Sequence, residues 1–79
     1  MTKKPDSILD LRGCICPLSL LKASAALAAL DVGQCIEIIG TDAQTKQELF
    51  QILNPEEFRT IDIRELKTSY KIFLEKTAG

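Results

Sequence analysis

The chain has 79 residues, of which 46% are hydrophobic, and this length predicts one domain around a single core. Ten basic against eleven acidic residues give a net charge of −1, which argues against a protein that grips phosphate backbones, so no direct nucleic-acid partner is expected. No apolar stretch approaches the roughly 20 residues of a membrane helix. The N-terminal sequence MTKKPDS lacks the apolar region of a signal peptide, which predicts no membrane insertion and a cytoplasmic location.

The chain contains three cysteines and no histidine. An odd number of cysteines cannot form a complete disulfide framework, and in a reducing compartment the thiols are expected to stay free. The lack of histidine removes every Cys-His and Ser-His nucleophile pair and the commonest zinc ligand, which argues against protease-like chemistry. The composition therefore predicts thiol chemistry, with no metal and no cofactor.

The first half of the chain predicts a strand, a helix and a second strand, after a flexible segment at residues 1–7 that precedes a single domain at residues 8–77. Residues 8–12 alternate, with Leu9 and Leu11 on one face, and Gly13 ends the strand. Pro17 suits the first helical position. Helical spacing follows it, and the predicted apolar stripe consists of Leu20, Ala23, Leu27 and Leu30.

The second half predicts a strand, a helix and a terminal hairpin. Residues 35–39 form the strand, and the helix begins between residues 42 and 46, where residues 45–48 are expected to form a capping box. Its predicted buried residues are Leu49, Phe50 and Leu53. Ile61 and Ile63, then Tyr70, Ile72 and Leu74, alternate as two further strands. The order predicts an α+β fold: a two-layer βαβαββ sandwich with a four-stranded mixed sheet and two helices on one face.

Cys16 lies where the first strand gives way to the first helix. Helix N-termini carry unpaired N–H groups and the positive end of the dipole, which predicts a lowered pKa for its thiol. A drop of about 1.5 units from an ordinary pKa near 8.5 would ionise about half of the thiol at neutral pH. Arg12 and Lys22 would add to this effect if their side chains reach the sulfur. The alternative is that Cys16 only fills the corner as a small hydrophobic residue.

Residues 10–13, Asp-Leu-Arg-Gly, followed by Cys16-Pro17, resemble the signature of the TusA/SirA sulfur-carrier family, D-x-x-G-x-x-C-P-x-P. The resemblance continues through the Ala/Leu-rich helix, Val32-Gly33, the isoleucine-rich strand and Thr41-Asp42 to the terminal hairpin. It implies the sandwich predicted above. It also implies that Cys16 accepts sulfane sulfur as a persulfide, with Arg12, Gly13, Pro17 and Ser19 as supporting residues.

The resemblance further implies a carrier that acts with partner proteins more than a self-contained enzyme. The expected sulfur donor is a cysteine desulfurase or a rhodanese-like protein, the acceptor is a second protein, and the chain itself is expected to be a monomer or weak dimer. Three pathways stay open: tRNA thiolation, molybdenum cofactor supply and sulfur oxidation.

Two departures from the family pattern bear on these expectations. Ser19 stands where the family's second proline usually lies, and a serine there either hydrogen-bonds a sulfur anion or is simply tolerated, which is the favoured interpretation. Ala43 and Phe50 stand where the second helix of the family often has prolines. This second departure bears on the choice of partner more than on sulfur transfer.

The other two cysteines are expected to be structural, but Cys14 has an alternative role. As a resolving thiol it would attack an oxidised or persulfidated Cys16 and make the protein a redox switch. The rival hypothesis is accordingly a non-enzymatic regulatory, redox or transporter-associated binding module that uses the thiols of Cys14 and Cys16. Cys35 begins a strand, and no neighbour in sequence suggests that its thiol is activated.

Overall fold

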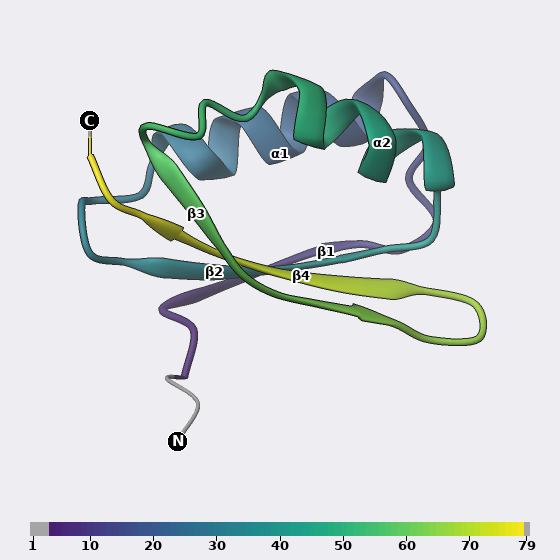
Figure 1. Ribbon diagram of the computed structural model, residues 1–79. Coiled ribbons are helices and arrows are strands. Elements are labelled where there is room, and N and C mark those ends of the chain that lie inside the picture. The colour runs from purple at the N-terminus through teal and green to yellow at the C-terminus, as the bar shows by residue number, and fades with distance from the viewer. Residues whose placement is uncertain (1–3, 79) are drawn as a thin grey trace.

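The computed structural model describes residues 4–78 and has two layers (Figure 1). The sheet consists of β1 (Ser7–Leu11), β2 (Cys35–Gly40), β3 (Phe58–Glu65) and β4 (Tyr70–Lys76), and the helices are α1 (Leu18–Ala28) and α2 (Ala43–Ile52). The strand order is β1-β2-β4-β3, with β1 parallel to β2 and both other pairs antiparallel. Both helices cover the same face of this sheet. The predicted βαβαββ sandwich is confirmed.

The core lies between the sheet and the two helices. In β2 and β4 every second side chain turns toward the helices, as the alternation predicts. The helices bury Ala23, Leu27 and Leu49 against these strands. The fully packed strand residues are Leu11, Ile36, Ile38, Ile72 and Leu74.

Close packing in this core also explains the glycine at the end of β2. Gly40 pairs with Tyr70 of β4, and the Tyr70 ring lies across it, with Cζ and Cε1 only 2.6 and 2.8 Å from where a Cβ would stand. Tyr70 is itself buried and donates a hydrogen bond of 3.0 Å from its hydroxyl to the carbonyl of Asp42. Gly40 therefore provides the space for a ring that ties β4 to the start of α2.

The predicted stripe of α1 is confirmed at Ala23, Leu27 and Leu30, all three of which are buried, and Ser19 joins it. Helix α1 begins at Leu18, with Pro17 at the N-cap, and it buries Ser19, Ala23 and Leu27. Leu20, predicted to be in the stripe, is only half-buried. The difference arises because α1 packs on α2 as well as on the sheet, and the face that meets α2 carries a small polar side chain.

The predicted capping box at residues 45–48 is wrong. Asp42 is the N-cap of α2, and the Thr45 hydroxyl donates a hydrogen bond of 2.7 Å back to the Asp42 carboxylate. Glu48 lies too far into the helix to reach an N-cap N–H, and its side chain turns instead toward Cys16.

β3 is an edge strand with little cover. Ile61 and Ile63 are each 42% exposed, although their alternation predicts a half-buried strand. A register shift between Thr60 and Asp62 interrupts the pairing with β4. β3 stands at the end of the strand order, and these two side chains lie outside the core cluster, although Phe58 at the start of the strand packs against it.

The N-terminal part of the described chain is anchored to β2. β1 begins at Ser7, one residue earlier than predicted, and Asp6 forms two hydrogen bonds with Cys35: one between the main chains at 2.9 Å and one from the Cys35 N–H to the Asp6 carboxylate at 2.8 Å. The rest of the predicted flexible segment includes residues 1–3, which lie outside the described residues. Within residues 4–78, neither helix is long and apolar enough to cross a membrane.

Candidate functional site

The Cys16 segment connects β1 to α1 at the carboxyl ends of the two parallel strands. Gly13 turns the chain there with a φ of +81°, a conformation that suits glycine. Its N–H donates a hydrogen bond of 3.1 Å to the Thr41 hydroxyl, just after β2. The peptide bond between Cys16 and Pro17 is cis. The segment is thus held against the loop that leads into α2.

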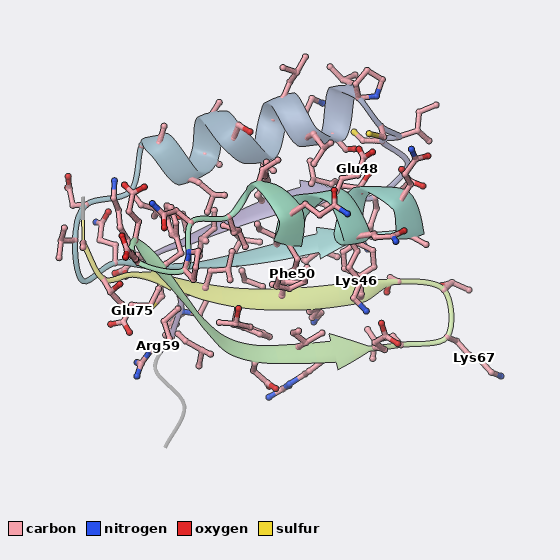
Figure 2. The ribbon with its side chains drawn as sticks, turned by 45° about the horizontal axis from the view of Figure 1, so that its top comes forward. Lys46, Glu48, Phe50, Arg59, Lys67 and Glu75 are labelled. Carbon is pink, nitrogen blue, oxygen red and sulfur yellow. The ribbon has the colours of Figure 1, made fainter. Side chains whose placement is uncertain are left out.

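Two carboxylates hold Cys16. Its thiol donates a hydrogen bond to Glu48 Oε2, with Sγ 3.0 Å away, and its backbone N–H donates to Asp42 Oδ2 at 3.1 Å. Figure 2 shows Glu48 on the side of α2 turned toward the segment that precedes α1. Cys16 is half-buried, so its sulfur lies at the surface rim of the helix layer and not in the core.

The prediction of a lowered thiol pKa is wrong. The pKa of Cys16 is raised to about 11, first by the hydrogen bond to Glu48, then by desolvation and by the negative charges of Glu48 and Asp42. The reason is the geometry of the junction. α1 begins only at Leu18, and the group that faces the sulfur is a carboxylate and not the N–H groups of a helix end.

The two basic residues near Cys16 in sequence make other contacts. Arg12 forms an ion pair of 2.7 Å with Asp10, and this pairing lowers the pKa of the Asp10 carboxyl to about 2. The Lys22 ammonium donates to the sulfur of Cys14 at 3.6 Å. Neither side chain is bonded to the Cys16 sulfur, so the expected cationic support for a thiolate is not found there.

Asp42 joins three parts of the fold. Its Oδ2 accepts hydrogen bonds from the Thr45 hydroxyl and the Cys16 N–H, and its carbonyl accepts from Tyr70. The hydrogen bond from Thr45, followed by that from Cys16, lowers the pKa of the Asp42 carboxyl. Asp42 therefore stays ionised at neutral pH and fixes the backbone of Cys16 relative to α2.

Ser19 does not contact the sulfur. Its side chain is fully buried between the helices, and its oxygen lies 2.5 Å from the Thr45 hydroxyl oxygen. Because the single Thr45 hydroxyl proton points to Asp42, Ser19 is the donor to Thr45. The Ser19 N–H also donates to the Ile15 carbonyl at 3.0 Å, a bond that the proline of the family pattern could not make. In this chain, serine at this position connects α1 to α2.

This chain of hydroxyls predicts a coupled effect on stability. Ser19→Ala and Thr45→Val should each lower the free energy of unfolding by about 1–2 kcal/mol, because each leaves a buried partner without its hydrogen bond. The double variant should lose less than the sum, since no buried hydroxyl is then left unpaired. Urea denaturation of the four proteins measures this coupling, and strictly additive losses would contradict the proposed connection.

The other two cysteines have different surroundings. Cys35 is 4% exposed, which agrees with a structural role, while Cys14 is half-buried, packs partly against the core and contacts Lys22. The three thiols, all within the described residues, are free.

Residues 4–78 contain no group of three or more potential metal ligands. An open pocket of about 630 Å³ lies between α2 and the β3–β4 turn, and Cys16 does not line it.

Sequence reasoning missed the residues that act on the thiol. The sequence pattern predicts Thr45 and Glu48 only as parts of a capping box, and Asp42 only as a candidate start of the second helix. The available signal was periodicity: residues 45, 48 and 49 lie on adjacent positions of one helix face, next to the buried Leu49. The packing of α1 on α2, which decides what this face meets, is not encoded in that spacing.

Comparisons with known proteins agree with this fold. Over 46 residues, which make up 58% of this chain and 61% of the relative, the sequence is 35% identical to the Bacillus subtilis (strain 168) protein named "Putative sulfur carrier protein YrkI". The alignment thus spans less than two thirds of that relative's length. The crystal structure of a SirA-like protein from Desulfitobacterium hafniense is similar in fold, with a TM-score of 0.73 over 90% of this chain and 97% of that one, at 17% identity. A family model described as "Sulfurtransferase TusA" matches residues 7–76, and the chain therefore belongs to the TusA sulfurtransferase family.

Proposed function

We propose that this protein is a sulfur carrier that accepts sulfane sulfur as a persulfide on Cys16 and relays it to an acceptor protein. The observation that carries the proposal is the position of Cys16: its thiol lies at the rim of the helix layer, bonded to Glu48, whereas Cys35 is buried in the sheet. Family membership and the name of the Bacillus relative support sulfur carriage. A surface thiol can reach a partner's sulfur without opening the core.

The relay needs two displacements and no external oxidant. In the first, the Cys16 sulfur attacks the outer sulfur of a donor persulfide, an S–S bond to Cys16 forms, and the bond between the donor's two sulfurs breaks. The donor leaves as a thiolate and takes up a proton, which replaces the one lost from Cys16. In the second, an acceptor thiolate attacks the terminal sulfur, and Cys16 leaves as a thiolate. Oxidation states balance, because one sulfane sulfur moves each time.

The surface around Cys16 is suited to a protein partner. Three apolar residues close to Cys16 in sequence have exposed side chains: Ile15 is 69% exposed, Leu18 53% and Leu21 67%. Exposed large apolar side chains are typical of contact surfaces between proteins. The proposed donor is a cysteine desulfurase or a rhodanese-like protein in the cytoplasm.

The test is a transfer assay with the native chain. Incubation with a cysteine desulfurase and radiolabelled cysteine should load about one sulfur per chain. Addition of dithiothreitol should release that sulfur as sulfide, and prior blocking of the surface thiols with iodoacetamide should prevent loading. A chain that gains no label, or label that reductant does not release, would overturn the proposal.

The redox-switch alternative makes a different prediction for Cys14. A resolving thiol must reach the sulfur of Cys16, whereas the Cys14 sulfur is bonded to Lys22. In the carrier proposed here, Cys14→Ser keeps both the loading of sulfur and its release to an acceptor. A Cys14→Ser chain that loads sulfur but cannot release it would favour the resolving thiol.

A further inference from the structure

The surroundings of Cys16 are negatively charged, because two carboxylates lie beside it. Glu48 Oε2 lies 3.0 Å from the sulfur, and Asp42 Oδ2 lies 3.1 Å from the backbone nitrogen of the same residue. Both acidic residues are half-buried, so water screens their charges less than it screens fully exposed ones. A negative charge that develops on the sulfur therefore meets negative charge on the α2 side of the site.

The nearby basic residues do not compensate for these charges. Arg12 is paired with Asp10 on the β1 side, and Lys22 of α1 contacts Cys14. Lys46 of α2 is paired with Glu65 and lies over the Tyr70 ring, and Figure 2 shows it on the side of α2 away from Glu48. Within residues 4–78, neither Glu48 nor Asp42 forms an ion pair with a basic side chain.

We propose that Cys16 selects sulfur donors that carry a cationic group beside the reacting sulfur, with Glu48 as the residue that receives this cation. The inference rests on the proposed function and names the class of donor for the same thiol. A cation paired with Glu48 withdraws the carboxylate from the thiol proton and offsets the charge that develops on Cys16 as it attacks. In a protein donor, an arginine or lysine next to the persulfide fulfils this condition. Anionic donors, such as thiosulfate acting directly, are repelled.

Cys14 provides an internal comparison for Cys16. Cys14 lies two residues away, but its sulfur faces the Lys22 ammonium at 3.6 Å and not a carboxylate. The two thiols therefore present opposite charges to an approaching reagent. The overall charge of the protein would change the rates at both thiols in the same direction. A difference in charge preference between the two thiols therefore arises from their local surroundings.

Disulfides of different charge test the proposal. Cystamine is cationic, 2-hydroxyethyl disulfide is neutral and 3,3′-dithiodipropionate is anionic. Each is reacted with the native chain, and peptide mass spectrometry follows the rate at each cysteine. We expect Cys16 to react with cystamine about tenfold faster than with the anionic reagent, and this ratio to shrink as salt is raised. At Cys14 the order should reverse. Equal rates with the three reagents at Cys16, or a ratio that salt does not change, would overturn the proposal.

Matched variants assign the preference to one residue. Glu48→Gln should lower the cationic-to-anionic ratio at Cys16 severalfold, whereas Glu56→Gln removes the same charge from an exposed position after α2 and should leave the ratio unchanged. An unchanged ratio in Glu48→Gln would refute the role of Glu48. Cysteamine persulfide and mercaptopropionate persulfide extend the comparison to sulfane sulfur. If neither persulfide loads Cys16 while the disulfide preference persists, both the proposed sulfur-carrier function and the proposed preference for cationic donors are refuted. If both persulfides load Cys16 at equal rates, only the preference for cationic donors is refuted.

Discussion

Glu48→Gln should speed the alkylation of Cys16 by iodoacetamide at pH 7 by up to about tenfold. The Glu48 hydrogen bond is the largest cause of the pKa of about 11, so loss of this carboxylate should lower the pKa, while desolvation and the charge of Asp42 continue to raise it. Loss of the entire rise from 9.0 would increase the thiolate fraction at neutral pH by about a hundredfold, which is the upper limit of the effect. The less basic thiolate is a weaker nucleophile, with a Brønsted slope of about 0.4–0.5, and this offsets about tenfold of the gain.

The pH profile of this reaction separates the charge effect from a change in access. The profile should rise with a midpoint near 11 in the native chain and at a clearly lower pH in Glu48→Gln. Glu56→Gln is the control, because it removes the same charge outside the site. Equal midpoints in the native chain and Glu48→Gln would show that the carboxylate does not hold the thiol proton.

The raised thiol pKa also makes stability depend on alkaline pH. The folded-state pKa of Cys16 lies above its unfolded value of about 8.5. Its contribution is therefore fully present below about pH 8.5 and is lost as the pH rises toward about 11. Urea midpoints should fall over this window more in the native chain than in Glu48→Gln. Tyr70, whose pKa burial also raises, adds a loss of the same sign in both proteins, so it cancels in the comparison.

Gly40→Ala should lower the free energy of unfolding by about 1–3 kcal/mol, the usual cost of overpacking. Alanine normally stabilises a strand relative to glycine, because glycine loses more backbone entropy on folding. Here the space decides the sign: the new Cβ would fall within 2.8 Å of the ring atoms Cζ and Cε1 of Tyr70 and still closer to its hydroxyl. Movement of the ring would also break its hydrogen bond to Asp42 and loosen the loop that holds Cys16.

A double variant controls for this interpretation. Tyr70→Leu removes the ring, so Gly40→Ala in that background should be neutral or slightly stabilising. Urea denaturation gives the free energies of the four proteins, and alkylation of Cys16 follows the loop. A loss of the same size in both backgrounds would mean that the Tyr70 ring is not the obstacle.

The fold could be predicted from the sequence because each element has a clear period. Leu9 and Leu11, Ile36 and Ile38, and Ile72 and Leu74 alternate in strands whose inner faces are indeed covered, so periodicity and burial agree. The prediction failed where cover depends on the strand order, which periodicity does not specify. Ile61 and Ile63 alternate equally well, but β3 is at the edge of the sheet, and both stay exposed.

The site was less predictable, because it is assembled from segments far apart in the chain. The position of Cys16 at the junction of β1 and α1 follows from local pattern, but Glu48 meets it across 32 residues of sequence. The dipole of a helix end depends only on the local backbone, and the lowered pKa predicted from it is wrong because the carboxylate that raises the pKa comes from another helix. The neighbours of Ser19 in sequence likewise give no sign of its role, because its partner Thr45 lies on the other helix.

Peptide mapping of the sulfur-loaded native chain tests the central claim most directly. After incubation with a cysteine desulfurase and cysteine, the persulfides are trapped by alkylation, the chain is digested under nonreducing conditions, and the mass of each cysteine peptide is compared with an unloaded sample. Because Cys14 and Cys16 share one peptide, fragmentation must assign the added sulfur to one of them. The account predicts one extra sulfur atom on Cys16 and none in a Cys16→Ser chain. Added sulfur on Cys14 or Cys35, with loading that survives Cys16→Ser, would contradict it.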